Sequence, residues 1–596
     1  MILVFGGTTE GRMAAKVLDE SGSVYYYSTR SDVQDIHLAH GVRLAGTMEL
    51  EQMQAFCLEH GIALIIDATH PFARNLHHNV VRLAQQLQVP LIRLNRIFPP
   101  HDSDLVWCRD YSDAISQLER HHVKSLLALT GVNTIGELHE YWSRHECWFR
   151  ILDRDDSRRA TADAGFPQDH LVYYEKHDTE SLLMQLQPQA IITKESGVSG
   201  GFVQKVDAAR KRGVQVFVVE CPSYPSAPDV VIAHVNGPHG LRRAVEKLLP
   251  EFYPLHSGLT TGTCATAAAI AATTRLTTGK TPSEVPVVLP NGETIHVPVT
   301  YGDGYAVVFK ESGDDPDVTN GIEIRATVTR SDKFEIVGGE GVGTFTFPGF
   351  DYPPGEPAIN KAPRQMMRDN IKENVRIVIS VPEGAEKAQR TFNPRLGIEG
   401  GISIIGVSGI VKPFSEDAFI ESIHKCMQVA KASGAERVVI NSGGKSERFV
   451  KALYPDLPQQ AFVEYGNYIG ETLRFADELG FKHVTLGVML GKAVKLAAGN
   501  LDTHSRRSTM DKAFISSMLH EAGCDIDISG ITLARELWEA IPQEKIQSFV
   551  TVVINHCSEH CNRLLPNGEL LILLITDDGV IYDSAKLINF ANQLNK

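Results

Sequence analysis

Long apolar segments are scarce in this sequence. The longest such run, Leu570 to Ile575, is far shorter than the roughly 20 residues that a membrane-spanning helix needs. The first residues, 1–5, are apolar, but they lack a basic segment before them and lead at once into glycines, as a first strand does and a signal peptide does not. We therefore expect a soluble protein without a membrane partner.

Cysteine is sparse, and an excess of positive charge is absent. The nine cysteines are scattered, odd in number and without framework spacing, which favours reduced thiols in the cytoplasm. With 58 Lys and Arg against 72 Asp and Glu, the net charge of -14 repels a phosphate backbone, so we expect no nucleic-acid partner. His556, Cys557, His560 and Cys561 have metal-like spacing, but a second ligand pair is missing nearby, so we predict no metal site.

A length of 596 residues, 43% of them hydrophobic, predicts about three to five globular domains. Up to residue 250, short apolar runs alternate with amphipathic stretches, which indicates βαβ units and parallel sheets. The expected strands are Ile2–Phe5, Val24–Tyr27, Ala63–Ile66, Ser125–Leu129, Ile191–Thr193 and Val214–Val219. A proline-containing stretch, 89–100, suggests two lobes of about 1–97 and 98–250.

A change of composition at 249–257 places the main boundary there and gives a second domain of 251–596. Residues 282–350 are rich in Val, Thr and Gly with turn signals such as Asn291-Gly292, which predicts an antiparallel sheet. From 376 to 503 the βαβ rhythm returns, with strands at Val438–Ile440 and Val484–Val488. The overall expectation is a multidomain α/β protein whose second half combines α+β and α/β parts.

A glycine loop follows the first expected strand and opens a helix, where backbone N–H groups can hold a pyrophosphate. Thr8 occupies the middle glycine of the usual dinucleotide pattern, so a plain tight turn stays as the alternative. The second strand ends in a hydroxyl and a guanidinium that could accept a 2′-phosphate. The candidate cofactor-binding residues here are Gly6, Gly7, Thr8, Glu10, Gly11, Arg12, Ser28 and Arg30.

Two further strands end in polar or glycine-rich segments. Asp67, Thr69 and His70 come directly after a strand, where open α/β sheets place ligand-binding residues. Lys194 precedes a second glycine loop with Gly200 and Gly201, and its alternative is a structural turn. We predict Asp67, Thr69, Lys194, Gly200 and Gly201 as cofactor-binding, and His70 as a positioning or proton-relay group because imidazole can titrate near neutrality.

Similar loops occur in the second half. Gly443, Gly444 and Ser446 follow a strand, and Glu464 ends a later one, an arrangement that suits an adenosine-containing ligand. The Gly-Lys-Ser triplet at 444–446 is not a P-loop, because the required first glycine would fall at Val439. The segment 491–507 combines four cations, including Lys492 and Arg506, with His504, and it could recognise a carboxylate-rich ligand or be a charged surface. Residues 314–317 hold three acids that form a solvated turn, order a loop or handle a proton.

The loops of residues 1–249 resemble those of the precorrin-6A reductase family. The matching motifs are the Gly-Gly-Thr-x-Glu-Gly-Arg loop at 6–12, the Asp-Ala-Thr-His-Pro-Phe block at 67–72 and a Thr-Lys-x-Ser-Gly loop at 193–197. The resemblance implies two Rossmann-like lobes with NADH or NADPH between them, delivering hydride to a corrin precursor. The loop at 195–199 departs from the pattern because it is longer.

Residues 258–583 resemble the cobalt-precorrin-5B C(1)-methyltransferase family nearly end to end. The matching blocks include Thr-Thr-Gly-Thr-Cys at 260–264, Gly-Asp-Asp-Pro-Asp-Val-Thr at 313–319 and Thr-His-Ser-Arg at 503–506. The resemblance implies S-adenosyl-L-methionine as donor, a ring carbon of a cobalt tetrapyrrole as nucleophile, and a fold unlike other corrin methyltransferases. Under it, Arg364, Arg395, Lys492 and Arg506 are candidates for the substrate carboxylates, His504 for a proton step, and Gly443, Gly444, Ser446 and Glu464 for the donor.

Together these patterns predict a bifunctional enzyme of corrin-ring synthesis that methylates with its second half and reduces the product with its first. Two alternatives stay open: a metabolite-binding scaffold without turnover, and a chain with only one active half. The expected partner is the cobalt-tetrapyrrole substrate. A homo-oligomer and transient contact with other corrin-pathway enzymes also stay open, as does the choice between NADH and NADPH.

Overall fold

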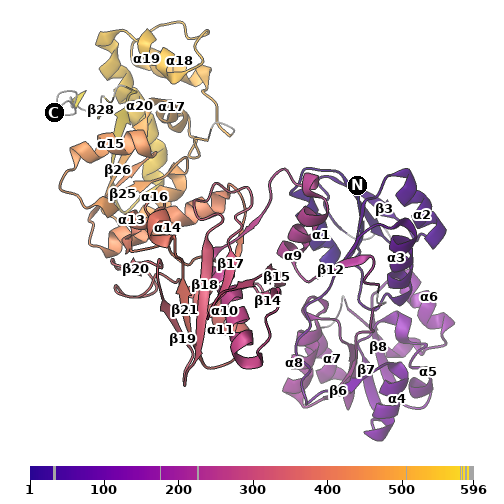
Figure 1. Cartoon of the computed structure of the whole chain (residues 1–596). Coiled ribbons are helices and arrows are strands. Elements are labelled where there is room, and N and C mark those ends of the chain that lie inside the picture. Colours follow the sequence, from indigo (N-terminus) through magenta and orange to yellow (C-terminus); the bar gives the residue numbers. More distant parts are fainter. Residues whose placement is uncertain are drawn as a thin grey trace. The chain divides into compact units, whose positions relative to one another are not determined.

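The computed structural model describes residues 1–588 except 31, 33, 34, 175, 177, 225, 226, 505, 506, 578, 580 and 584–586 (Figure 1). The chain forms two compact units. The first comprises Met1–Ser257 together with Pro286–His296, and the second comprises Gly258–Val285 and Val297–Lys596. The segment 286–296 packs into the first unit through Glu293, which is 1% exposed and accepts a hydrogen bond from the backbone N–H of Gly240.

The first unit contains two six-stranded sheets, and all strands in each sheet are parallel. The first sheet has the order β12 (Val231–Val235), β5 (Leu91–Leu94), β4 (Leu64–Asp67), β1 (Ile2–Phe5), β2 (Tyr25–Thr29) and β3 (Gly41–Ala45). Its helices are α1 (Thr9–Asp19), α2 (Leu50–Glu59), α3 (Arg74–Leu87) and α9 (Pro238–Leu248). Ile2 and Val4 pack into one core and Leu3 and Phe5 into another, so the sheet is buried on both faces.

The second sheet has the order β6 (Val106–Cys108), β11 (Gln215–Val219), β10 (Ala190–Lys194), β7 (Ser125–Ala128), β8 (Glu146–Ile151) and β9 (Leu171–Tyr173). Its helices are α4 (Tyr111–Arg120), α5 (His139–Trp142), α6 (Asp155–Asp163), α7 (Thr179–Leu186) and α8 (Phe202–Arg212). The two Rossmann-like lobes with parallel sheets are therefore confirmed. The structure differs from the expected second lobe of 98–250 at its end, because β12 pairs with β5 and returns the chain to the first sheet.

The second unit begins with a mainly antiparallel sheet. Its order is β16 (Thr300–Tyr301), β17 (Ala306–Phe309), β18 (Glu323–Arg330), β21 (Val375–Ser380) and β19 (Glu335–Gly338), with only β19 and β21 parallel. Helix α10 (Thr261–Thr278) packs along β17 and β18 and against α11 (Lys361–Asn370). Smaller pairs are β13 (Gly258–Leu259) with β23 (Ile410–Val411), and β20 (Thr344–Phe345) with β22 (Ile398–Glu399). The pair of β14 (Glu284–Val288) and β15 (Thr294–Pro298) is shared, because its residues 286–296 belong to the first unit.

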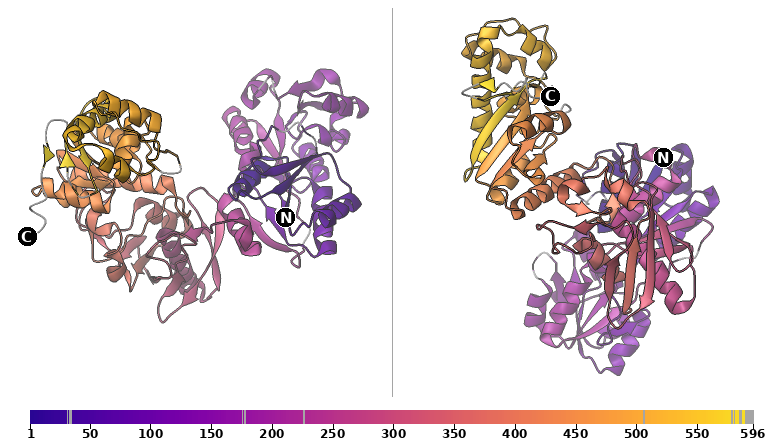
Figure 2. Two further views of the ribbon diagram at one scale, coloured as in Figure 1. Left: turned by 90° about the horizontal axis from the view of Figure 1, so that it is seen from above. Right: turned by 60° about the vertical axis from the view of Figure 1, so that its left-hand side comes forward.

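The chain then forms a third large sheet after the short helices α12 (Gly384–Ala388) and α13 (Asn393–Leu396). The order is β25 (Phe462–Glu464), β24 (Arg437–Asn441), β26 (His483–Met489), β27 (Glu569–Ile575), β28 (Ile581–Tyr582) and β29 (Leu587–Ile588). Core clusters cover both faces, and Figure 2 shows helices on each side. These helices are α14 (Glu416–Ala432), α15 (Gly444–Leu453), α16 (Ile469–Glu478), α17 (Leu490–Ala497), α18 (Lys512–Glu521), α19 (Ala534–Ala540) and α20 (Ile546–Cys561). None of the helices in the described ranges is long and apolar enough to cross a bilayer.

Candidate functional site

Each parallel sheet has one place where the strand order reverses, and crossovers on the two sides of that place leave in opposite directions. The reversal lies between β1 and β4 in the first sheet, between β7 and β10 in the second, and between β24 and β26 in the third. Open α/β sheets bind ligands in the crevice at the carboxyl ends of such strands. The predicted loops at 6–12, 67–72 and 443–446 follow these strands directly.

Two side chains shape the loop after β1: Thr8 holds it by hydrogen bonds, and Tyr27 packs against it. The Thr8 hydroxyl accepts from the Gly11 N–H at 3.0 Å as the helix N-cap, and it donates to the Ala68 carbonyl at 2.7 Å. A Cβ on Gly6 would lie 2.3 Å from the Tyr27 ring, so this position needs glycine. Gly7 has a φ of +92°, and a Cβ added to it would meet nothing within 4 Å, which leaves its outer side open to a phosphate.

Glu10, a candidate cofactor-binding residue of the same loop, is buried and paired within the protein. It is 5% exposed, its Oε2 accepts from Arg96 Nε at 3.0 Å, and its Oε1 accepts from the Ser199 hydroxyl. Burial raises the pKa of the Glu10 carboxyl, but the Ser199 hydrogen bond and the Arg96 charge outweigh it and lower that pKa. Glu10 therefore joins the loop after β1 to the loop after β10. Arg12 is exposed and bonds only Thr9 among described partners.

At the end of β2, one candidate for a 2′-phosphate is buried and the other is exposed. Ser28 is 6% exposed within the strand, whereas Arg30 directly after it is exposed to solvent.

The block after β4 contains a buried ionic cluster. Asp67 is 1% exposed, and its carboxylate contacts His77 Nδ1 at 2.6 Å, the Thr69 hydroxyl at 2.7 Å and Arg93 Nε at 3.4 Å. The other ring nitrogen of His77 lies 3.1 Å from the His70 carbonyl oxygen. Burial raises the pKa of Asp67, but the hydrogen bond and charge of His77 outweigh it and lower that pKa. Asp67 and Thr69 thus hold the loop in place.

His77 and Arg93 also belong to this cluster, although neither stood in a motif of the sequence. Arg93 is 1% exposed, and its guanidinium lies 4.5 Å from the centre of the Tyr224 ring. The sequence could have indicated His77 by its place seven residues after His70, at the start of α3. From there its ring reaches back to the His70 carbonyl. Through the His70 carbonyl, His77 fixes the backbone that carries His70.

His70 is partly buried, and its Nδ1 accepts from the Phe72 N–H at 3.2 Å. Nδ1 therefore carries no proton, and Nε2 is the N–H that can donate to a ligand. Burial, with the charges of Arg96 and Lys194, lowers the pKa of His70 to about 4. This corrects the expectation of titration near neutrality: at neutral pH His70 is a neutral hydrogen-bond donor, which suits positioning.

A cavity of about 390 Å³ lies at the carboxyl ends of β7, β8 and β10. Lys194 lines this cavity, and burial lowers its pKa to about 8. Gly200 packs against Arg96, because a Cβ there would lie 2.7 Å from Nη1, whereas Gly201 is open and begins α8. Lys194 Nζ also lies 5.3 Å from the centre of the Phe72 ring, so this end of the second lobe adjoins the block after β4.

In the second unit, the glycine loop after β24 and the end of β25 adjoin one another. A Cβ on Gly443 would lie 2.3 Å from Glu464 Oε1, and the Gly443 N–H donates to Asn441 Oδ1 at 2.8 Å. Gly444 has open space at its Cβ position, and Ser446 is 1% exposed and donates to the Gly443 carbonyl at 2.9 Å. Gly443, Gly444 and Glu464 form one surface. Ser446 is buried beneath it and holds the loop by its hydrogen bond to Gly443.

Two of the predicted substrate cations reach this surface. Arg395 Nη1 lies 2.9 Å from Glu447 and 3.8 Å from Glu464, and Lys492 donates to the Gly466 carbonyl. Burial raises the pKa of Glu464, partly offset by Arg395 and Lys492. Arg364 lies elsewhere and holds its own loop, donating to the Ile359 carbonyl at 2.8 Å.

The predicted cluster at 491–507 is only partly an array of free cations. Arg507 pairs with Asp502 at 3.0 Å and with Glu416, and Lys495 donates to the Thr503 carbonyl at 3.3 Å. The backbone N–H of His504 donates to Asp502 Oδ1 at 3.0 Å, so Asp502 orders this loop. Arg506 lies outside the described residues.

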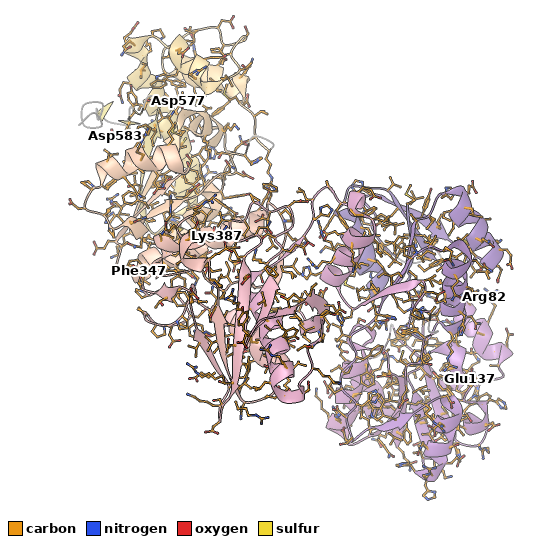
Figure 3. The ribbon with its side chains drawn as sticks, in the orientation of Figure 1. Arg82, Glu137, Phe347, Lys387, Asp577 and Asp583 are labelled. Atoms are coloured by element: carbon orange, nitrogen blue, oxygen red, sulfur yellow. The ribbon has the colours of Figure 1, made fainter. Side chains whose placement is uncertain are left out.

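Three other motifs have structural partners. Asp317 accepts from Lys310 at 2.6 Å and from the Thr319 hydroxyl at 2.6 Å, so the acids at 314–317 order a loop. Lys445 of the Gly-Lys-Ser triplet pairs with Asp577 at 3.0 Å, a residue that Figure 3 labels. Cys557 and Cys561 point into the core of the third sheet, whereas His556 pairs with Glu521 at 2.9 Å on another side of α20.

Three family models match the chain. The model described as precorrin-6x reductase CbiJ/CobK matches residues 1–236, that of CbiD matches 250–413, and that of the CbiD C-terminal domain matches 502–585. Both resemblances seen in the sequence are thereby confirmed.

The second half of this chain matches most of the length of its relatives. A cobalt-precorrin-5B C(1)-methyltransferase of Prosthecochloris aestuarii is 39% identical over 352 residues, 55% of this chain and 95% of the relative. That of Salinispora arenicola is 45% identical over 307 residues, 48% of this chain and 81% of the relative. Similar solved structures are a cobalamin biosynthesis protein (cbiD) from Archaeoglobus fulgidus (31% identity, 42% of this chain and 83% of that chain, TM-score 0.25) and a CobK precorrin-6A reductase (20%, 42% and 96%, 0.35).

The close approach of Gly6 to Tyr27 gives a test of the first loop. In Gly6→Ala the new methyl group collides with the ring and displaces the loop, so binding of NADPH and NADH should weaken by about tenfold or more. Fluorescence titration of the reduced nicotinamide measures this. Gly136→Ala is the matched control, because its Cβ meets nothing within 4 Å. Equal affinities of the two variants would contradict the site.

The neutral state of His70 gives a pH prediction. Its pKa is about 4 when folded and near 6.5 otherwise, so the unfolded chain binds more protons between these values and folding stability falls as the pH drops through that window. His70→Asn should lose part of this acid sensitivity, while His78→Asn, at an exposed position, should keep it. Urea midpoints followed by tryptophan fluorescence report this, since Trp107, Trp142 and Trp148 lie in the first unit. Identical pH profiles for both variants would refute the assignment.

Proposed function

This chain belongs to the cobalt-precorrin-5B C(1)-methyltransferase family, and we propose that it is a fused enzyme of cobalamin biosynthesis. Its second unit methylates cobalt-precorrin-5B at ring carbon 1 to give cobalt-precorrin-6A, and its first unit reduces a ring double bond of that product to give cobalt-precorrin-6B. The observation that supports both steps is the presence in one chain of a methyltransferase match over 95% of a relative and a reductase match over residues 1–236.

The methylation step rests on the surface of Gly443, Gly444 and Glu464. S-Adenosyl-L-methionine supplies an electrophilic methyl group on its sulfonium. Glu464 can accept hydrogen bonds from ribose hydroxyls, and the glycines let backbone approach the donor closely. Lys492, beside Glu464, is the cation best placed for a substrate carboxylate. Arg395 offsets the negative charges of Glu447 and Glu464. Alignment of the ring carbon with the methyl group and exclusion of water supply most of the rate.

The reduction step rests on the loops after β1 and β4. NADH or NADPH supplies the hydride. Gly7 and the Thr8-capped start of α1 hold the pyrophosphate, and Arg30 at the end of β2 favours the 2′-phosphate of NADPH. The Nε2–H of His70 donates a hydrogen bond to the bound ligand, while His77 and Asp67 hold its backbone in place. The ring carbon beside the one that takes the hydride also takes up a proton, which solvent can supply. No covalent step by the protein is needed, because the hydride passes directly from an oriented donor to the acceptor.

Mass spectrometry of the product separates the two steps. With cobalt-precorrin-5B and S-adenosyl-L-methionine alone, the product should gain one methyl group; addition of NADPH should then add two hydrogens. Gly443→Ala should lose the first gain, because its methyl group collides with Glu464, while Gly530→Ala, in open space, should keep it. A scaffold protein would give neither gain, and a chain with one active half would give only its own.

Fusion should favour direct use of the first product, because tethering raises its local concentration. A full-length chain with both Gly6→Ala and Gly443→Ala serves as a trap that neither makes nor reduces the intermediate. An excess of this trap should leave the yield of reduced product unchanged. Loss of the reduced product in proportion to the trap would show that the intermediate is released to solvent.

A further inference from the structure

The cavity at the reversal between β7 and β10 holds positive charge that the mechanism above does not use. Lys194 lines it, and Arg150, 6% exposed at the end of β8, lies over the Tyr174 ring at 4.0 Å, with Tyr174 itself in the cavity wall. Lys205 on α8 is close enough that Arg150 and Lys194 each help to lower its pKa, after burial, to about 8. Three cations therefore converge on one side of the second lobe.

The charges of the two lysines are not neutralised by acids in the part of the chain that the structure describes. There, neither Lys194 nor Lys205 has a hydrogen bond or ion pair, and burial alone accounts for the lowered pKa of Lys194. Arg96 nearby shows the contrast, because Glu10 pairs with it. An uncompensated, partly buried ammonium costs folding free energy, and an anionic ligand recovers that cost.

The surroundings favour a carboxylate over a nucleotide phosphate. After β7, Gly131 leads into a single 3-10 turn, Val132–Thr134, and not into an α-helix, so the N–H groups that hold a pyrophosphate after β1 have no counterpart here. The Thr130 hydroxyl is already bonded to that of Thr134 at 2.6 Å. Ile151 and Leu152 give the cavity an apolar wall. Cations beside apolar walls suit an acidic arm attached to a hydrophobic ring.

We propose that this cavity of the second lobe binds a carboxylate side arm of the tetrapyrrole, with Lys194 and Lys205 as its cations. The inference rests on the proposed reductase function and reassigns Lys194 from the cofactor to the substrate. The first lobe then holds the nicotinamide and the second holds the ring, each at its own reversal of strand order.

Lys194→Met and Lys205→Met test the proposal, and Lys211→Met on the exposed side of the same helix is the control. The assay uses the full chain with preformed cobalt-precorrin-6A and NADPH, so that only the reductase site is read. Cobyrinic acid, a corrin polycarboxylate, is the inhibitor, and its fully methylated ester is the uncharged comparison. Each lysine variant should raise the KM for cobalt-precorrin-6A and the inhibition constant of cobyrinic acid about tenfold or more, leaving the KM for NADPH and the effect of the ester unchanged.

Thermal unfolding gives a readout that does not depend on activity. Because each methionine removes an uncompensated buried charge, both variants should unfold at a higher temperature than the wild type, and Lys211→Met should not. A raised KM for NADPH with unchanged inhibition by cobyrinic acid would overturn the proposal in favour of a cofactor phosphate. Lowered unfolding temperatures would also overturn it, by showing that the lysines have structural partners. A wild type that does not reduce cobalt-precorrin-6A at all would instead contradict the proposed function.

Discussion

The constraint on which both units depend is the handedness of the crossover between parallel strands. Because such crossovers are right-handed, a sheet that grows first on one side of its starting strand and then on the other must separate two loops at the reversal. This happens between β1 and β4, between β7 and β10, and between β24 and β26. The glycine loops and the charged strand ends gather at these places, so topology selects the sites before any particular side chain does.

The sequence was a good guide to whatever is local. Ile2–Phe5 is a strand as expected, and the strands expected near Val438 and Val484 are present as Arg437–Asn441 and His483–Met489. Buried strands of a parallel sheet are continuous apolar runs, which a single sequence displays directly. The return of β12 to the first sheet could not be foreseen, because the choice of an edge partner depends on contacts between residues far apart, such as Val231 and Leu91.

The site residues divide in the same way. Gly6 and Gly443 must be glycine, because a Cβ there would collide with Tyr27 or with Glu464. Both stand in loops that the sequence identified. The partners of charged groups were hidden: Glu10 is tied to Arg96, 86 residues away, and Asp67 to His77 and Arg93. A sequence shows that a charge is present but not whether another charge neutralises it. For that reason Glu10 and Arg364 looked available for ligands.

The first unit is built from two separate stretches of chain, Met1–Ser257 and Pro286–His296. Glu293 of the later stretch is buried and bonds the backbone at the start of α9. A gene divided after codon 257 would therefore encode a reductase that lacks part of its own packing, although the cut falls at the obvious boundary. The boundary between the two units in the fold therefore does not coincide with one cut in the sequence.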